Sequence, residues 1–416
     1  MNQSKLNIQL NSDKNLVSKE RTTQRIVEIR VQAPEASANE QRPDINLALV
    51  LDRSGSMQGE KLEYVKQAAR HVLDQLQAQD QVSLVVYDDS VDVLAHSIQV
   101  TNGNRFEMKQ LISSILSGSM TNLRDGWLTG CKEIAASARE GSINRTMLLT
   151  DGLANVGETD PEILAQHAFE LNKDSISTST FGVGHGFNEH LLEAMANKGG
   201  GNFYYIEKPA RIPAIFLKEF EELIGITVCK VEVRIDFPMS MEWQVLGGWP
   251  AEYKDGSLHI YVGDMLSGKL QDIYVKLQVP ASEAADSMKL AAKVFGQGQP
   301  GAVYEDQADI SFQYANAQEV EEAALNREVM ERFSVVELAD AATEALKLER
   351  RGEREEASRM LNQRISQNQP YIHPQVETSY RSMSNRMKRG MDEADRKRSQ
   401  WESYNAKREK EQTKED

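Results

Sequence analysis

The chain has 416 residues, 40% of them apolar and 27% charged, a balance typical of a globular protein with a substantial core. Lys and Arg number 48 against 63 Asp and Glu, so the net charge of −15 argues against nucleic acid or anionic membranes as partners. No run of about 18 apolar residues occurs, which argues against a membrane-spanning helix. Only two cysteines are present and no apolar leader follows Met1, so we expect no disulfide scaffold and a cytoplasmic location.

The first region, residues 1–43, shows apolar residues at every second position, which predicts β-strands. The alternating residues are Leu6, Ile8 and Leu10, then Val27, Ile29 and Val31. We expect these strands to belong to a β-sandwich whose other strands come later in the chain.

The second region, residues 44–226, alternates strand-like apolar runs with helical patterns, which predicts an α/β fold with a doubly wound, mostly parallel sheet. The predicted strands are Ile45–Leu51, Val82–Tyr87, Thr146–Thr150, Thr178–Val183 and Phe203–Ile206, with Val91–His96 as an antiparallel edge. The predicted helices lie near 60–77, 104–116, 123–139, 161–173, 188–197 and 210–225. Ligands of such sheets bind beyond the carboxyl ends of the strands.

The last two regions, residues 227–315 and 316–416, differ in the spacing of their apolar residues. Residues 227–315 return to period-two alternation with turn signals, which predicts the body of the β-sandwich. Residues 316–416 have helical periodicity and breaks at Arg351-Gly352 and Gln369-Pro370. The basic cluster Arg396-Lys397-Arg398 is interleaved with acids and is interpreted as a solvated helix face, and Lys407–Asp416 as a charged, frayed end.

Oxygen-bearing side chains follow two of the predicted parallel strands. Asp52, Ser54 and Ser56 come at alternate positions after the first strand, and Asp151 follows the strand that ends at Thr150. Thr121 lies between them in the sequence, in a polar turn before a helix. Carboxylates and hydroxyls without His or Cys are the ligand set that a hard cation such as Mg²⁺ prefers.

This ordered set resembles the metal-ion-dependent adhesion site of the von Willebrand factor type A domain, a Rossmann-like α/β fold, over roughly residues 44–226. By this resemblance, Ser54, Ser56 and Thr121 supply hydroxyl contacts, while Asp52 and Asp151 act directly or through water. The resemblance implies Mg²⁺, or Mn²⁺ or Ca²⁺ in its place, whose coordination is completed by an Asp or Glu of a protein partner. It also implies that the helix near 210–225 can shift when the metal gains that ligand.

These observations predict a non-enzymatic adhesion or scaffold module. Two alternatives stay open: an adaptor for an ATP-driven remodelling machine, because some bacterial relatives are encoded with such ATPases, and an Mg²⁺-dependent aspartyl phosphotransferase. The phosphotransferase pattern needs a second Asp where this chain has Ser54. A serine hydrolase is disfavoured because no Gly-x-Ser-x-Gly elbow surrounds Ser54, Ser56 or Ser119. The simplest competing interpretation is that both Asp residues only cap helices and turns. The sequence does not indicate the partner or the oligomeric state.

Overall fold

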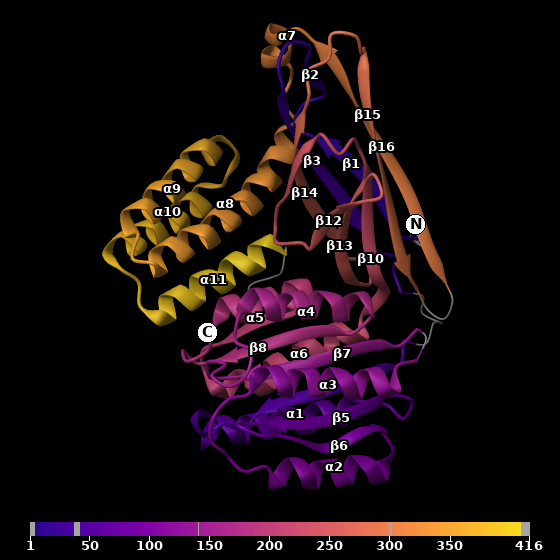
Figure 1. Ribbon diagram of the computed structural model, residues 1–416, viewed down its shortest axis with the longest axis vertical. Helices are drawn as coiled ribbons and strands as arrows, with labels where there is room; N and C mark the ends of the chain where they lie inside the picture. The colour runs from indigo at the N-terminus through magenta and orange to yellow at the C-terminus, as the bar shows by residue number, and fades with distance from the viewer. Residues whose placement is uncertain (1–4, 37–41, 140, 299–301, 409–416) are drawn as a thin grey trace.

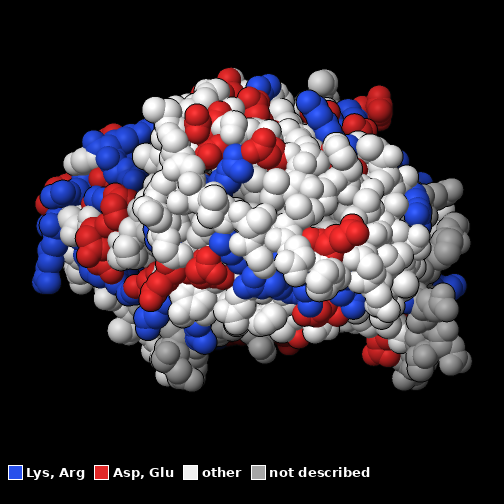
Figure 2. Space-filling view, turned by 90° about the horizontal axis from the view of Figure 1, so that it is seen from below, with Lys and Arg blue, Asp and Glu red and all other residues white. Residues whose placement is uncertain are grey.

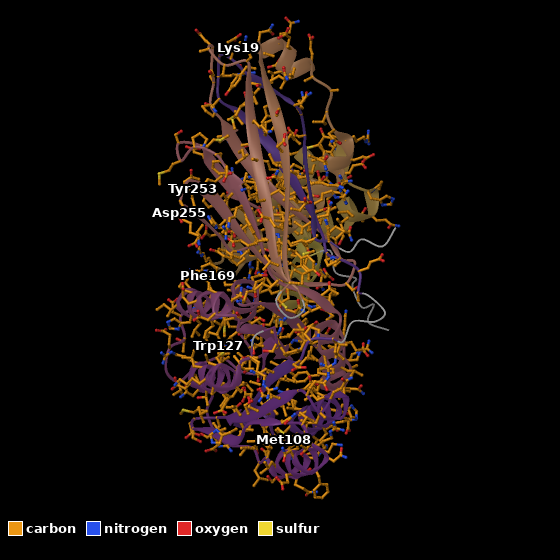
Figure 3. The ribbon with its side chains drawn as sticks, turned by 90° about the vertical axis from the view of Figure 1, so that its right-hand side faces the viewer. Lys19, Met108, Trp127, Phe169, Tyr253 and Asp255 are labelled. Atoms are coloured by element: carbon orange, nitrogen blue, oxygen red, sulfur yellow. The ribbon has the colours of Figure 1, made fainter. Side chains whose placement is uncertain are left out.

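The computed structural model describes residues 5–36, 42–139, 141–298 and 302–408. Figure 1 shows three parts: an α/β domain at the bottom, two long β-sheets above it, and a group of helices beside the sheets. Figure 3 gives the same arrangement from the side, with Lys19 at the free end of the long sheets and Met108 at the opposite end of the molecule. Within the described ranges, no helix combines the length and the apolar character that a bilayer crossing requires.

The α/β domain is built on a six-stranded sheet with the order β6-β5-β4-β7-β8-β9. Its strands are β4 (Ile45–Asp52), β5 (Gln81–Tyr87), β6 (Val91–Gln99), β7 (Ile143–Thr150), β8 (Ser177–Val183) and β9 (Gly200–Ile206). All neighbours pair in parallel except β5 and β6, which are antiparallel. The prediction of a mostly parallel sheet with an antiparallel edge strand is confirmed.

Helices cover both faces of this sheet. Alternate residues of β4 point to opposite sides, so Leu47 and Leu49 join one apolar core while Ala48 and Val50 join the other. The first core is completed by α1 (Glu60–Gln75), α2 (Asn102–Ser114) and α6 (Ile212–Ile224), and the second by α3 (Leu123–Ser137), α4 (Pro161–Lys173) and α5 (Glu189–Lys198). Every residue of β4 and β7 is buried, as expected for central strands of a sheet covered on both sides.

Helix α3 lies so close to the sheet that Gly126 leaves no room for a side chain. A Cβ atom there would lie 2.5 Å from Cγ of the buried Tyr87 ring. We therefore expect Gly126→Ala to lower the free energy of unfolding by about 1–3 kcal/mol, because overpacking outweighs the gain in helix propensity. Urea denaturation measures this change. Gly103→Ala in α2, where the nearest atom would be 4.0 Å away, is the matched control; equal effects of the two substitutions would contradict the prediction.

The two remaining sheets pack face to face and enclose a third apolar core. One has the order β1-β3-β14-β11 and the other β12-β13-β10-β15-β16-β2. Their strands are β1 (Asn7–Ser12), β2 (Leu16–Ser18), β3 (Thr23–Gln32), β10 (Ile226–Asp236), β11 (Glu242–Val245), β12 (Ala251–Lys254), β13 (Ser257–Leu266), β14 (Leu270–Val279), β15 (Ser287–Gln297) and β16 (Val303–Ala315). Strands that precede the α/β domain thus pair with strands that follow it. Because α6 ends at Ile224 and β10 begins at Ile226, the two parts are joined without a linker.

The C-terminal helices are α7 (Ala317–Glu322), α8 (Arg327–Arg350), α9 (Arg354–Asn368), α10 (Pro374–Arg389) and α11 (Glu393–Lys407). Short 3-10 helices lie at Gly55–Met57 (η1), Pro209–Arg211 (η2) and Gln369–Tyr371 (η3). Phe333 and Val336 of α8 pack on Tyr274 and Ile26, on the outer face of the four-stranded sheet. The far half of α8 shares a core with α9 and α10. Helix α11 then lies between this bundle and the α/β domain (Figure 1).

Helix α11 docks on the α/β domain through buried ion pairs. Lys397 is 1% exposed and its Nζ lies 2.8 Å from Glu189 of α5, while Lys407 Nζ lies 2.9 Å from Glu193. The interpretation of residues 396–398 as a solvated face is therefore wrong. The reason is that α5 buries two carboxylates one turn apart, and each needs a cation from α11. Lys407 is also buried rather than frayed, and the last eight residues lie outside the described ranges.

This interface predicts acid sensitivity. Burial alone would raise the pKa of Glu193 above its usual 4.5. The charge of Lys407 and a hydrogen bond from Gln400 act in the opposite direction and outweigh burial, so the pKa of Glu193 is lowered. A carboxyl group whose pKa is depressed by folding stabilises the protein above its unfolded pKa, and that stabilisation is lost as pH falls through the folded value. We therefore expect the unfolding free energy to fall with pH below about 4.5, and less steeply in Glu193→Gln. Denaturation series between pH 6 and 3 measure both slopes; equal slopes would contradict the prediction.

Candidate metal centre

The predicted residues lie at the carboxyl edge of the central strands. Asp52 is the last residue of β4, Asp151 directly follows β7, and these two strands are parallel neighbours. The connection from β4 leads to β5 on one side, whereas the connection from β7 leads to β8 on the other. Such a reversal of direction opens a crevice at the strand ends, which is where α/β sheets bind ligands.

Hydrogen bonds link the side chains of this cluster. Asp52 accepts from the backbone N–H of Ser54 (2.8 Å) through Oδ1 and from the Thr150 hydroxyl (2.6 Å) through Oδ2. The hydroxyls of Ser54 and Ser56 are 3.1 Å apart, and Ser56 Oγ donates to Asp151 Oδ1 at 2.6 Å. The tight turn of η1 after β4 therefore directs both serine hydroxyls toward the two carboxylates.

Thr121 reaches the same place from a third loop. Its side chain is buried, its backbone N–H donates to Asn155 Oδ1 (3.0 Å), and its carbonyl accepts from Asn155 N (3.3 Å). A Cβ atom on Gly152 would lie 3.4 Å from Thr121 Oγ1 and 3.6 Å from Ser56 Oγ, so both hydroxyls border that position. The structure thus brings together all five residues singled out in the sequence. Ser119 is exposed, and its carbonyl accepts from Gly55 N.

The carboxylates of the cluster are withdrawn from water. Asp52 is fully buried and Asp151 is 2% exposed. Burial raises the pKa of Asp52 to about 6, although hydrogen bonds from Thr150 and Ser54 lower it. The adjacent Arg53 turns away, because its guanidinium pairs with Asp88 (3.3 Å) and Asp92 (2.5 Å) on the far side of the loop. A buried anionic cluster of this kind favours a bound cation.

Lys61 is part of the cluster and was missed in the sequence. Its ammonium forms an ion pair with Asp151 Oδ2 and also donates to the Ser56 carbonyl at 3.2 Å. Lys61 is the second residue of α1, where the helix dipole disfavours a positive charge. A lysine in the first turn of the helix that follows a predicted cation site was the available signal.

Three apolar side chains are exposed in the loops that carry the cluster. Met120, next to Thr121, is 56% exposed, and Leu153, two residues after Asp151, is 57% exposed. Leu116, earlier in the Thr121 loop, is 77% exposed. Seen from below, the α/β domain carries acidic and basic side chains in separate small groups with uncharged surface between them (Figure 2). The net charge is therefore not gathered into one acidic patch on that face.

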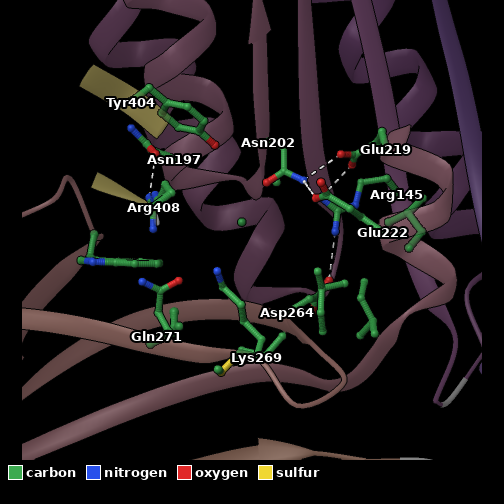
Figure 4. Close-up of a pocket in the computed structure, with 18 residues that line it drawn as sticks. Arg145, Asn197, Asn202, Glu219, Glu222, Asp264, Lys269, Gln271, Tyr404 and Arg408 are labelled. Atoms are coloured by element: carbon green, nitrogen blue, oxygen red, sulfur yellow. Dashed lines mark hydrogen bonds and ion pairs between the residues drawn. The ribbon is translucent and has the colours of Figure 1, made fainter. Parts of the chain in front are cut away.

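A pocket of about 100 Å³ lies elsewhere, where the α/β domain, the long sheets and α11 meet (Figure 4). Its charged groups pair mainly with one another: Arg145 lies 3.2 Å from Asp264 and 3.6 Å from Glu219, and Asn202 donates to Glu219 and Glu222. These contacts join the parts of the molecule. None of the five residues of the cluster at the strand ends lines this pocket.

Comparison with known proteins places this geometry in a family. Residues 46–218 match the von Willebrand factor type A domain, a range that includes all five predicted residues and Lys61. The chain contains a von Willebrand factor type A (VWA) domain. Over 97% of its length the chain superposes on 97% of a von Willebrand factor type A protein from Catenulispora acidiphila, with a TM-score of 0.76 and 16% identity, a likeness of fold.

Curated relatives resemble the VWA region. An uncharacterised protein of Synechocystis, sll0103, is 33% identical over 218 residues, which is 52% of this chain and 50% of that protein. The human inter-alpha-trypsin inhibitor heavy chain H3 is 32% identical over 227 residues, 53% of this chain and 25% of that protein. The match thus spans half or less of these relatives, and it supports the VWA domain rather than the activity of either whole protein.

Proposed function

We propose that the VWA domain binds a divalent cation, Mg²⁺ or in its place Mn²⁺ or Ca²⁺, and through it an acidic side chain of a partner protein. The observation that carries this proposal is the convergence of five oxygen-bearing side chains from three separate loops on one buried point: Asp52, Ser54, Ser56, Thr121 and Asp151. A cap or turn role alone would not require Asp151 to meet Ser56, which lies 95 residues away in the chain.

The donor set suits a hard dication. Two carboxylates balance the two charges of the ion, and the hydroxyls add oxygen donors without adding charge. The ammonium that Lys61 places on Asp151 indicates that the cluster attracts cations. When bound, the metal would act as the electrophile that holds the acidic group of the partner, while Asp52 and Asp151 would hold the metal.

The surroundings of the site suggest the kind of partner segment. Because Met120 and Leu153 expose apolar side chains beside the metal ligands, an acidic residue with apolar neighbours would match the site better than one in a run of charges. VWA domains are typically protein-interaction modules, and the human relative is named as a heavy chain of a trypsin inhibitor. These features agree with a non-enzymatic scaffold role. We propose the cytoplasm as the compartment in which the protein acts.

Partner capture in the presence of Mg²⁺ or EDTA tests the proposal. The tagged full chain is expected to retain a partner in Mg²⁺ and to release it in EDTA, and Asp151→Ala should retain it in neither. Asp89→Ala is the matched control, because Asp89 is exposed at the end of the neighbouring β5 and its loss changes the charge equally. If the wild type kept its partner in EDTA, or if Asp151→Ala kept it in Mg²⁺, the metal mechanism would be contradicted.

A further inference from the structure

We infer that Lys397, on the C-terminal helix α11, is a positioning residue for the metal site, so that docking of α11 and metal binding are coupled. The inference rests on the proposed metal function. It concerns the loop between β8 and α5, residues 184–188, which touches the candidate site on one side and α11 on the other.

On the side of the site, the loop lies against the backbone of Asp151. Gly186 approaches so closely that a Cβ atom on it would lie 2.6 Å from the Asp151 carbonyl oxygen. Only glycine fits there without displacing the residue that carries one of the two candidate metal carboxylates. The position of the loop therefore constrains the position of Asp151.

On the other side, the loop is held by Lys397. The buried Lys397 Nζ donates to the Phe187 carbonyl at 2.5 Å and lies 4.2 Å from the centroid of the Phe187 ring. Phe187 is 2% exposed and packs on Gly182, where a Cβ atom would lie 2.3 Å from the ring. The same ammonium bonds Glu189, which begins α5. The ammonium of Lys397 thus contacts the Phe187 carbonyl, the Phe187 ring and Glu189 at the start of α5, and these contacts hold the loop in place.

These contacts form a continuous path from α11 to Asp151, over a separation of more than 200 residues in sequence. Without Lys397, the Phe187 carbonyl loses a buried donor, and the loop gains freedom to move away from Asp151. A site whose ligands are less well positioned binds its metal more weakly. By linkage, metal binding must in turn stabilise the docked position of α11 by the same factor.

Magnesium titration of the full chain tests the inference through Lys397→Met. Glu189 keeps its ion pair with Arg350 in this variant, so the fold has a remaining cation at that position. We expect the affinity for Mg²⁺ to fall about tenfold, and Lys397→Arg to restore most of it because arginine also supplies several donors. The matched control is Arg398→Met, which removes the neighbouring ion pair from α11 to Glu207 and should leave the affinity within about twofold.

Two further measurements separate positioning from general destabilisation. Gly186→Ala disturbs the loop from the opposite side and should also weaken Mg²⁺ binding. Hydrogen exchange of residues 393–407 should slow when Mg²⁺ is added to the wild type, and this response should disappear in Lys397→Met. Unchanged affinity in Lys397→Met, or an equal loss in Arg398→Met, would overturn the inference while leaving the metal site intact. Absence of saturable Mg²⁺ binding in the wild type would overturn the proposed function and the inference together.

Discussion

Replacing Lys407 by methionine is expected to lower the free energy of unfolding by about 3–5 kcal/mol. Lys407 is 3% exposed and its ammonium lies 2.9 Å from Glu193, which is 5% exposed. Methionine keeps most of the apolar stem of the side chain but leaves Glu193 buried without its cation. The hydrogen bond from Gln400 remains, but an uncharged donor does not neutralise the carboxylate.

Denaturation followed by tryptophan fluorescence measures this loss. Trp401 is on α11 itself and Trp249 packs under the guanidinium of Arg408, so both report on the docked helix. Lys109→Met is the control, because Lys109 pairs with Asp74 where both side chains are at least 32% exposed, and such pairs contribute about 0–1 kcal/mol. A loss in Lys407→Met no larger than in this control would show that the buried pair does not hold α11 in place.

Replacing Lys61 by methionine is expected to strengthen Mg²⁺ binding by about tenfold, roughly 1.4 kcal/mol. In the structure the Lys61 ammonium bonds Oδ2 of Asp151, one of the two carboxylates proposed to hold the metal. Its charge also repels a dication at short range. The substitution removes both the competition and the repulsion. Because Lys61 is one-third exposed, solvent screens part of its charge, so we expect the gain in Mg²⁺ affinity to be no larger than about tenfold.

Calorimetric titration with Mg²⁺ measures the affinity of Lys61→Met, and Lys66→Met is the matched control. Lys66 lies on the same helix and carries the same charge, but its ammonium bonds Glu63 instead of the cluster. A general effect of net charge would strengthen binding equally in both variants. Weaker binding in Lys61→Met would instead mean that Lys61 supports the site rather than competing for it.

Most of the α/β domain was predictable from the sequence because apolar residues are spaced differently in its strands and in its helices. Continuous apolar runs such as Ile45–Leu51 indicated strands buried on both faces, and the parallel alternation placed their carboxyl ends at one edge. The grouping of Asp52 with Asp151 followed from that topology. The short strands β11 and β12, with four residues each, have too little periodicity to be recognised in this way.

The residues that were missed all act through contacts between distant segments. Lys61 follows the predicted cation site in the first turn of α1, but only the fold shows that its ammonium lies on Asp151. Lys397 was interpreted as solvated because charge runs usually are, and the sequence does not reveal that Glu189 lies opposite, 208 residues away. Local patterns predict elements, whereas the pairing of buried charges depends on how those elements are packed.

The central claim is that Asp52, Ser54, Ser56, Thr121 and Asp151 hold one divalent cation, and Mg²⁺ titration of the full chain tests it most directly. We expect a single saturable site in the wild type and in Asp89→Ala, and loss of that site in Asp151→Ala. Saturable binding that is equal in the wild type and in Asp151→Ala, or no binding in either, would contradict the claim.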